Sequence, residues 1–72
     1  MPRYRVDVYY HGITTVVVDA ETEDKAREVA ERFAPIADEL DIADSDAQTV
    51  SDRDADRYRN YNANGKEIDI EP

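Results

Sequence analysis

Three aspartates at every second position form the first pattern in this sequence that could bind a ligand. In the motif Asp52-x-Asp54-x-Asp56, carboxylates stand where an EF-hand loop carries its first three calcium ligands. Such a loop also needs a glycine at its sixth position, for a sharp turn, and a bidentate glutamate at its twelfth. Arg57 and Ala63 occupy those positions here. We therefore expect these aspartates to be solvated charges, with no metal site and no cofactor.

The residues needed for a nucleophilic or a phosphate-binding site are scarce. His11 is the only histidine, and Ser45 and Ser51 lie in an acidic segment with no second histidine or cysteine to build a relay. The chain's two glycines, Gly12 and Gly65, are too few for a glycine-rich phosphate loop. We therefore expect that the protein is not an enzyme.

Arginine and tyrosine alternate in two places, at 3–5 and at 57–59, where the sequence is RYR. If both segments are strands of one sheet, their four arginines project from one face, near Tyr61. Arginines beside exposed aromatic rings on a sheet can bind nucleic acid through phosphate contacts and stacking. The alternative is cross-strand pairing with acidic residues, such as Arg3 with Asp19. The net charge of −9 favours this alternative because it repels a polyanion.

Apolar side chains on the same face indicate a different kind of partner. Tyr9, Ile13 and Val17 are expected on the sheet face that a single helix leaves uncovered. An exposed apolar patch of this kind marks contact with a protein partner or with a second copy of the chain. The candidate interaction face therefore comprises Arg3, Arg5, Tyr9, Ile13, Val17, Arg57 and Arg59.

Two N-terminal strands are predicted to position much of this face. Residues 3–10 and 13–20 alternate in side-chain type and are rich in β-branched and aromatic residues. This pattern predicts a half-buried hairpin with His11-Gly12 in its turn.

Two registers of this hairpin stay open. A three-residue loop with Gly12 in the left-handed conformation would place Val6 opposite Val16 and stack the apolar residues. A two-residue His-Gly loop would place Val6 opposite Val17 instead.

A helix is predicted after Thr22, which is a good N-cap. Pro35 disfavours helical geometry in the residue before it, so the helix either kinks or stops and restarts. We favour a second short helical segment, because Ala37 and Leu40 continue the apolar stripe. The stripe itself has helical spacing and consists of Ala26, Val29, Ala30 and Phe33.

Residues 41–56 are rich in aspartate and are expected to form a connecting loop. Because wholly structureless loops of this length are uncommon in compact domains, we also expect a short strand around residues 48–51.

The C-terminal residues 55–72 predict a second hairpin. A three-residue loop that ends at a left-handed Gly65 aligns Tyr58 with Ile70. A two-residue Asn-Gly loop would place Arg59 opposite Ile70 and mix charge into the apolar face. We therefore predict the first register.

Together these elements predict one small domain over residues 1–72, of the α+β class. An antiparallel sheet made of two hairpins (ββαββ) carries one kinked or broken helix on one face. The inward-facing side chains are expected to be Tyr4, Val6, Val8, Val16, Val18, Ala26, Val29, Ala30, Phe33, Leu40, Tyr58, Ile68 and Ile70.

Acidic residues outnumber basic residues by 18 to 9. A compact chain this acidic repels itself at low ionic strength, whereas salt near molar concentration shortens the Debye length to about 3 Å. In composition the chain resembles haloarchaeal cytoplasmic proteins, which implies a halophile, and the alternative is an acidic protein of a mesophile. No apolar run is long enough to span a bilayer or to form the core of a signal peptide. We therefore expect a cytoplasmic protein without membrane contact.

Residues 4–33 also resemble the small DpnD/PcfM-like proteins. The shared pattern is a short strand, a second strand that ends in residues 16–20 (VVVDA), and an acidic start to an alanine-bearing helix. The positions that carry the helix start are Glu21, Glu23, Ala26 and Ala30. The resemblance covers less than half of the chain and implies no activity and no site residues.

The expected function is that of a non-enzymatic protein-interaction module, or a self-associating module, of a halophile. The alternative is an accessory nucleic-acid-binding protein that uses the arginines and tyrosines of the sheet face. Binding of single-stranded nucleic acid across a salt series distinguishes the two.

We predict that salt controls folding of this chain. Circular dichroism should show partial loss of secondary structure in dilute buffer and full structure in molar KCl, because salt screens the repulsion among the acidic side chains. Full folding in dilute buffer would contradict the halophilic interpretation.

Overall fold

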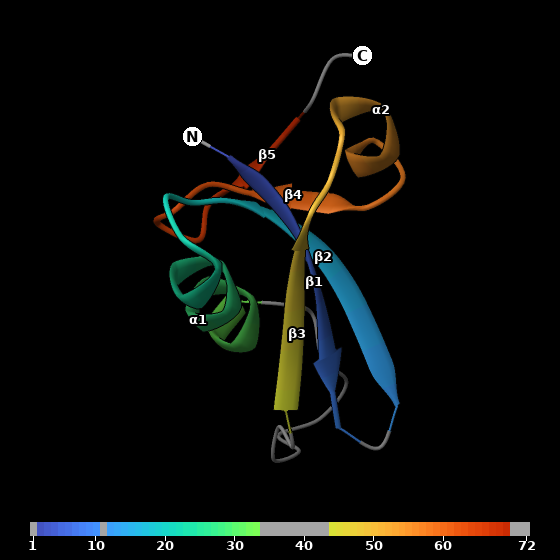
Figure 1. Ribbon diagram of the computed structural model, residues 1–72, viewed down its shortest axis with the longest axis vertical. Helices are drawn as coiled ribbons and strands as arrows, with labels where there is room; N and C mark the ends of the chain where they lie inside the picture. The colour runs from blue at the N-terminus through green and yellow to red at the C-terminus, as the bar shows by residue number, and fades with distance from the viewer. Residues whose placement is uncertain (1, 11, 34–43, 70–72) are drawn as a thin grey trace.

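The computed structural model describes residues 2–10, 12–33 and 44–69. The elements in chain order are β1 (Arg3–Tyr9), β2 (Ile13–Asp19), α1 (Glu23–Phe33), β3 (Asp44–Thr49), α2 (Asp52–Ala55), β4 (Arg59–Tyr61) and β5 (Glu67–Ile68). The strands form one sheet in the order β3-β1-β2-β4-β5, as Figure 1 shows. The predicted α+β class, with a helix packed on a mainly antiparallel sheet, is confirmed. Neither described helix is long and apolar enough to cross a membrane.

The β1–β2 hairpin has the register of the three-residue loop. Val6 lies opposite Val16, and Arg3 lies opposite Asp19. Arg3 Nε donates to Asp19 Oδ1 at 2.6 Å, so the predicted cross-strand ion pair is also present. This register places the apolar side chains of both strands on one face of the sheet.

The two turns differ in their use of glycine. Gly65 has a φ of +83°, as predicted, and its N–H donates to the Asn62 carbonyl at 2.9 Å. Gly12 differs, because it does not adopt the left-handed conformation of the G1-bulge loop, which was one of the two open alternatives. The Tyr10 N–H donates to the Gly12 carbonyl at 3.0 Å and helps to close that turn. His11, the expected turn residue, lies outside the described residues.

The Asp-rich segment is more regular than a connecting loop. It contains strand β3, which begins four residues before the short strand expected around residues 48–51 and overlaps it only at 48–49, and then the one-turn helix α2. On β3 the small side chains of Ser45 and Ala47 turn toward α1, whereas aspartates alternate on the other face. Ser51 begins α2, since its hydroxyl accepts from the Asp54 N–H at 3.2 Å.

β4 enters the sheet in a direction that two simple hairpins did not predict. It runs parallel to β2, with Val17 opposite Asn60. The chain between these strands contains α1, β3 and α2, and it is long enough for the crossover that a parallel pair needs.

The predicted register of the C-terminal hairpin is confirmed. Asn60 lies opposite Ile68, and Tyr61 lies opposite Glu67. These pairs have the same offset as the expected pairing of Tyr58 with residue 70, although residue 70 lies outside the described part of the chain. β4 is shorter than expected, because α2 and a turn occupy the residues before it.

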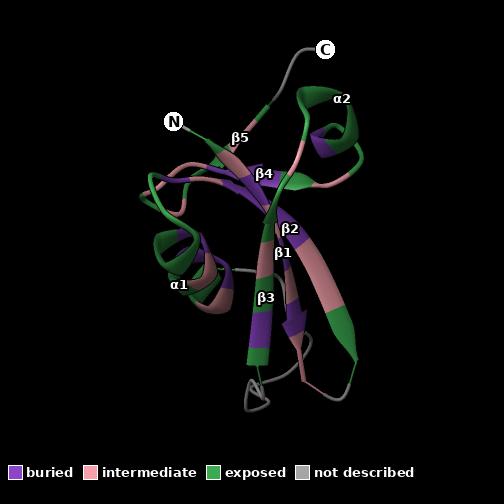
Figure 2. Cartoon of the chain, in the orientation of Figure 1, coloured by how far each residue is buried: buried purple, intermediate pink, exposed green. Residues whose placement is uncertain are grey.

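The core lies between the sheet and α1, where Figure 2 shows buried residues on the central strands and on one side of the helix. The Lys25 N–H donates to Thr22 Oγ1 at 3.1 Å, which confirms the expected N-cap of α1. Most of the expected inward residues are buried. The core cluster is Tyr4, Val6, Val8, Val16, Val18, Ala20, Ala26, Val29, Ala30 and Tyr61.

Three expected core residues are placed differently. Phe33 is 41% exposed, and its ring lies against Gly65 in the β4–β5 turn. Tyr58 and Ile68 are only half-buried and lie outside the core cluster. Pairing with β2 explains this difference, because Tyr61 lies opposite Val18 and therefore points inward in place of Tyr58. Two further expected core positions, 40 and 70, and the proline at 35 lie outside the described residues.

We predict that Gly65→Ala lowers the free energy of unfolding by about 2 kcal/mol, because the left-handed conformation is strained for alanine. The added methyl group would also overlap the Phe33 ring. Urea unfolding in molar KCl measures the change.

The matched control is Gly12→Ala, whose methyl group would lie at an ordinary 3.5 Å from the Tyr10 ring without a positive φ. This variant should change stability by no more than about 0.5 kcal/mol. Equal losses in the two variants would show that backbone strain at Gly65 is not the cause.

Candidate interaction surface on the outer sheet face

The outer sheet face, opposite α1, is divided into a covered half and an open half. The covered half contains Val17 and Asn60, which are both buried at the end of the sheet where α2 contacts β1. The open half carries the residues toward the other end of β1, β2 and β3. Its members are Asp7, Tyr9, Ile13, Thr15, Asp44 and Asp46, which share this face by register.

Helix α2 is held on the covered half by side chains from other elements. Asn60 Nδ2 donates to the carbonyls of Ala55 at 3.0 Å and of Tyr58 at 2.8 Å. The Arg3 guanidinium binds both Asp19 and Asp52, each at 2.6 Å, and so joins the β1–β2 pair to the start of α2. These contacts anchor a helix too short to be stable alone.

Burial under α2 changes the role of Val17. We expected its side chain to be exposed, but Val17 and Ala55 are both fully buried. The expectation was wrong because the Asp-rich segment was treated as a loop rather than as a cover for the sheet. Asn60 was not singled out either, although it is only 5% exposed. A lone amide in a strand between polar and aromatic residues is a weak signal for such an anchor.

The aspartates that first suggested calcium form the body of this cover. Asp52 and Asp54 lie in the first turn of α2, where free N–H groups favour negative charge, and Asp56 ends the helix. Within the ranges 2–10, 12–33 and 44–69, no cluster of acidic or histidine side chains has a geometry suited to a metal ion.

The structure does not bring the four arginines together. Arg3 is engaged by two aspartates. Arg5 lies against Gln48, whose amide oxygen, when turned toward the guanidinium, accepts from Arg5 Nε at 3.1 Å. Arg57 lies in the turn after α2. Arg59 is in register with inward-facing residues, so it lies on the α1 side of the sheet.

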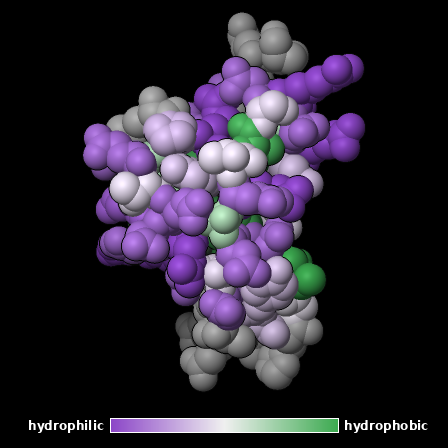
Figure 3. Space-filling model, in the orientation of Figure 1, coloured by the Kyte–Doolittle hydropathy of each residue, from purple (hydrophilic) through white to green (hydrophobic). Residues whose placement is uncertain are grey.

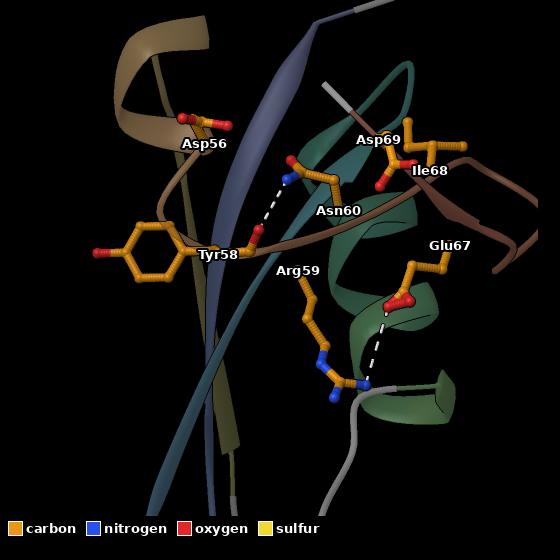
Figure 4. A pocket seen from close by; sticks show the side chains of 7 residues that line it. All are labelled: Asp56, Tyr58, Arg59, Asn60, Glu67, Ile68 and Asp69. Atoms are coloured by element: carbon orange, nitrogen blue, oxygen red, sulfur yellow. Dashed lines mark hydrogen bonds and ion pairs between the residues drawn. The ribbon is translucent and has the colours of Figure 1, made fainter. Parts of the chain in front are cut away.

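A hollow of about 230 Å³ lies beside Asn60, and Figure 4 shows the side chains that line it. Arg59 lies 3.8 Å from Glu67 there and is already paired. Asn60 Oδ1 is buried and has no hydrogen-bond partner among the described residues. The lining has neither histidine nor cysteine, and its ionisable groups are carboxylates, a tyrosine and the paired arginine.

The open half combines an exposed apolar residue with negative charge that is only partly paired, since Arg27 of α1 lies 3.7 Å from Asp44. Ile13 is 63% exposed, and Tyr9 lies directly opposite it on β1. Asp7 accepts a hydrogen bond from Thr15 Oγ1 at 2.7 Å. On the other side, Asp7 lies directly opposite Asp46, and like charges in this position destabilise a strand pair.

The open half is also partly hollowed. A depression of about 380 Å³ runs along β1 and β3 between Arg5 and Gln48 at one end and the Asp7–Asp46 pair at the other. Figure 3 shows that the surface in its view is mostly hydrophilic, with only small separate hydrophobic areas. On the face seen in this view, exposed apolar surface is therefore local.

The aspartates of the open half act on Tyr9. Desolvation of the phenol, a hydrogen bond to Asp46 and the negative charges of Asp46, Asp7 and Asp44 raise the pKa of Tyr9 above its ordinary 10.0. Tyr9 is therefore a neutral phenol at physiological pH, with Ile13 on one side and Asp44 on the other in the sheet.

Known proteins supply no family for this chain. No protein-family model matches it, and neither the curated proteins nor the solved structures contain a significant match. The resemblance to DpnD/PcfM-like proteins stays a prediction. The surface of the protein is therefore the basis for any inference about its function.

We predict that the Tyr9 phenol titrates at a higher pH than a free tyrosine. The native state favours the neutral phenol, so this contribution to stability is present below the ordinary pKa and is lost as pH rises through the native pKa. NMR of carbon-labelled tyrosine measures the midpoint, and Asp46→Asn should lower it.

The matched control for this titration is Glu67→Gln, which removes a carboxylate on the α1 side of the sheet. It should leave the Tyr9 midpoint unchanged. If Asp46→Asn leaves the titration midpoint of Tyr9 unchanged, the arrangement described for the open half is contradicted.

Proposed function

We propose that this protein is a non-enzymatic interaction module of a halophile that binds a basic segment of another protein on the open half. The observation that carries the proposal is the division of the outer face. Val17 is fully buried on the half where α2 lies, whereas Ile13 on the same strand is 63% exposed, opposite Tyr9 and diagonal to Asp7. An exposed large apolar side chain within a charged rim is typical of a contact surface.

Charge selects the class of partner. Asp7, Asp44 and Asp46 surround Tyr9, and the whole chain carries a net charge of −9. A guanidinium or ammonium group between Asp7 and Asp46 would relieve their repulsion and could also contact the Tyr9 ring. An arginine-bearing or lysine-bearing protein segment therefore fits this surface better than an acidic one.

High salt determines which contacts supply affinity. At molar ionic strength the Debye length is about 3 Å, so charges act only at contact distance and do not steer partners from afar. Ile13 and Tyr9 would then supply the apolar contact, and the aspartates would supply selectivity.

The alternative of nucleic-acid binding has weaker support. Arg3 and Arg59 are paired with acidic residues and face different sides of the sheet. A nucleic acid would also meet the net negative charge of the chain. Self-association through the open half would bring two sets of aspartates together.

The experiment is an NMR titration in molar KCl with a peptide of alternating arginine and valine, which should shift the amide signals of the open half. Ile13→Ser should weaken binding about tenfold, because the apolar contact is lost. Asp46→Asn should weaken it about twofold.

The charge-matched control is Glu28→Gln, on the exposed side of α1, where Glu28 lies 3.8 Å from Lys25. This variant should bind as the unmodified chain does. The proposal is wrong if Ile13→Ser has no effect or if an alternating glutamate and valine peptide binds equally well. Binding of single-stranded RNA that is lost on replacing Arg5 and Arg57 would favour the alternative.

A further inference from the structure

Strand β3 lies at one edge of the sheet, with β1 as its sole strand partner within the described ranges. The Val50 N–H donates to the Arg3 carbonyl at 3.0 Å, just beyond the end of β3. In an antiparallel pair the direction of the backbone groups alternates along the strand. The N–H and C=O groups of Ser45, Ala47 and Thr49 therefore point away from β1, toward the open edge.

Two of these three N–H groups have no acceptor among the described residues. The Ser45 N–H donates to Asp44 Oδ1 at 2.8 Å. The N–H groups of Ala47 and Thr49 have no hydrogen-bond partner within the part of the chain that the structure describes. The edge therefore offers alternating donors and acceptors to another strand.

β3 lacks most of the features that block edge strands. Its pairing with β1 continues without a bulge from residue 44 to residue 49. The strand contains no proline and no lysine, and charged side chains do not point inward from it. Its charged residues, Asp44 and Asp46, both lie on the outer face.

We infer that β3 takes up the basic partner segment as an added strand. This inference rests on the proposed function and specifies how the partner binds. Basic side chains of the added strand would lie on the outer face beside Asp44 and Asp46. Across the strands, they would extend the line of side chains formed by Asp7 and Asp46. Its alternate side chains would lie next to Ser45, Ala47 and Thr49, where small or β-branched residues fit.

A second copy of the chain fits this edge poorly. If two β3 strands paired antiparallel with their outer faces on the same side, Asp46 would lie opposite Asp44, Asp46 or Gln48 of the other copy, and it would lie diagonal to a second Asp46 in the last case. The two chains would also each carry a net charge of −9. The same aspartates that disfavour self-pairing select a basic strand.

Backbone pairing also suits a high-salt environment. Main-chain hydrogen bonds are between neutral groups, so molar salt weakens them much less than ion pairs. A segment of about seven residues is enough to cover β3, since a strand rises about 3.4 Å per residue.

The test uses the alternating arginine and valine peptide and two methylated forms of it. One form is methylated on every valine nitrogen, and the other on every arginine nitrogen, so both keep the full charge. In an added strand, only one of these two sets of N–H groups faces β3. We expect one methylated form to bind at least about tenfold more weakly than the other, and the unmodified peptide to slow hydrogen exchange at Ala47 and Thr49.

A pair of variants tests the same edge from the protein side. Thr49→Pro removes an N–H that faces the edge and leaves the pairing with β1 intact, whereas Thr49→Val keeps the N–H. We expect Thr49→Pro to weaken binding about tenfold and Thr49→Val to have little effect. Because edge strands tolerate proline at such a position, circular dichroism should show that both variants are folded.

The outcomes separate the two proposals. Equal binding of both methylated peptides, with no protection at Ala47 and Thr49, would overturn strand addition and leave face binding in place. Absence of binding by every basic peptide would overturn both. Protection of the same amides without peptide, together with dimers in sedimentation, would identify a second copy as the occupant and overturn the assignment of a basic partner.

Discussion

The antiparallel pairing of β1 with β2 is the constraint on which the rest of this structure depends. Val6 lies opposite Val16, and the Arg3–Asp19 ion pair closes the far end of the hairpin. Because side chains alternate with a period of two, a slip of one residue would turn one strand's apolar side chains from α1 to solvent. α1, β3 and β4 all pack against this pair. The register of β1 and β2 therefore decides which side chains of these three elements face the core.

The outer face shows how a small acidic chain uses both sides of one sheet. On the inner face, α1 and mostly small or branched side chains form the core. On the outer face, one helical turn is anchored by Arg3 and Asn60 and buries Val17. The rest of that face keeps Ile13 exposed among aspartates. The repulsion among these aspartates is therefore located on a surface whose charge a basic partner would neutralise.

Local patterns were enough to predict β1, β2 and α1, because alternation and helical spacing are encoded by neighbouring residues. The register of the C-terminal hairpin also followed from local turn and charge matching, whereas the register of the β1–β2 hairpin was one of two open alternatives. The candidate face was predicted less well. Ile13 and Tyr9 lie on the open half as expected, whereas Val17 is buried and Arg59 faces the other side. Those two placements depend on α2 and on the parallel pairing of β4, which are contacts between distant segments.

The sequence by itself determined the fold class, the central hairpin and the acidic character of the surface, since each depends on residue type or on short periodic patterns. Only the tertiary structure decided which sheet face each residue of β4 occupies, that the Asp-rich segment supplies an edge strand and a cover, and that the outer face has an open half. The physical reason is that Asp52 and Asn60 acquire their roles from Arg3 and Ala55, partners brought near them by folding and not by local sequence periodicity.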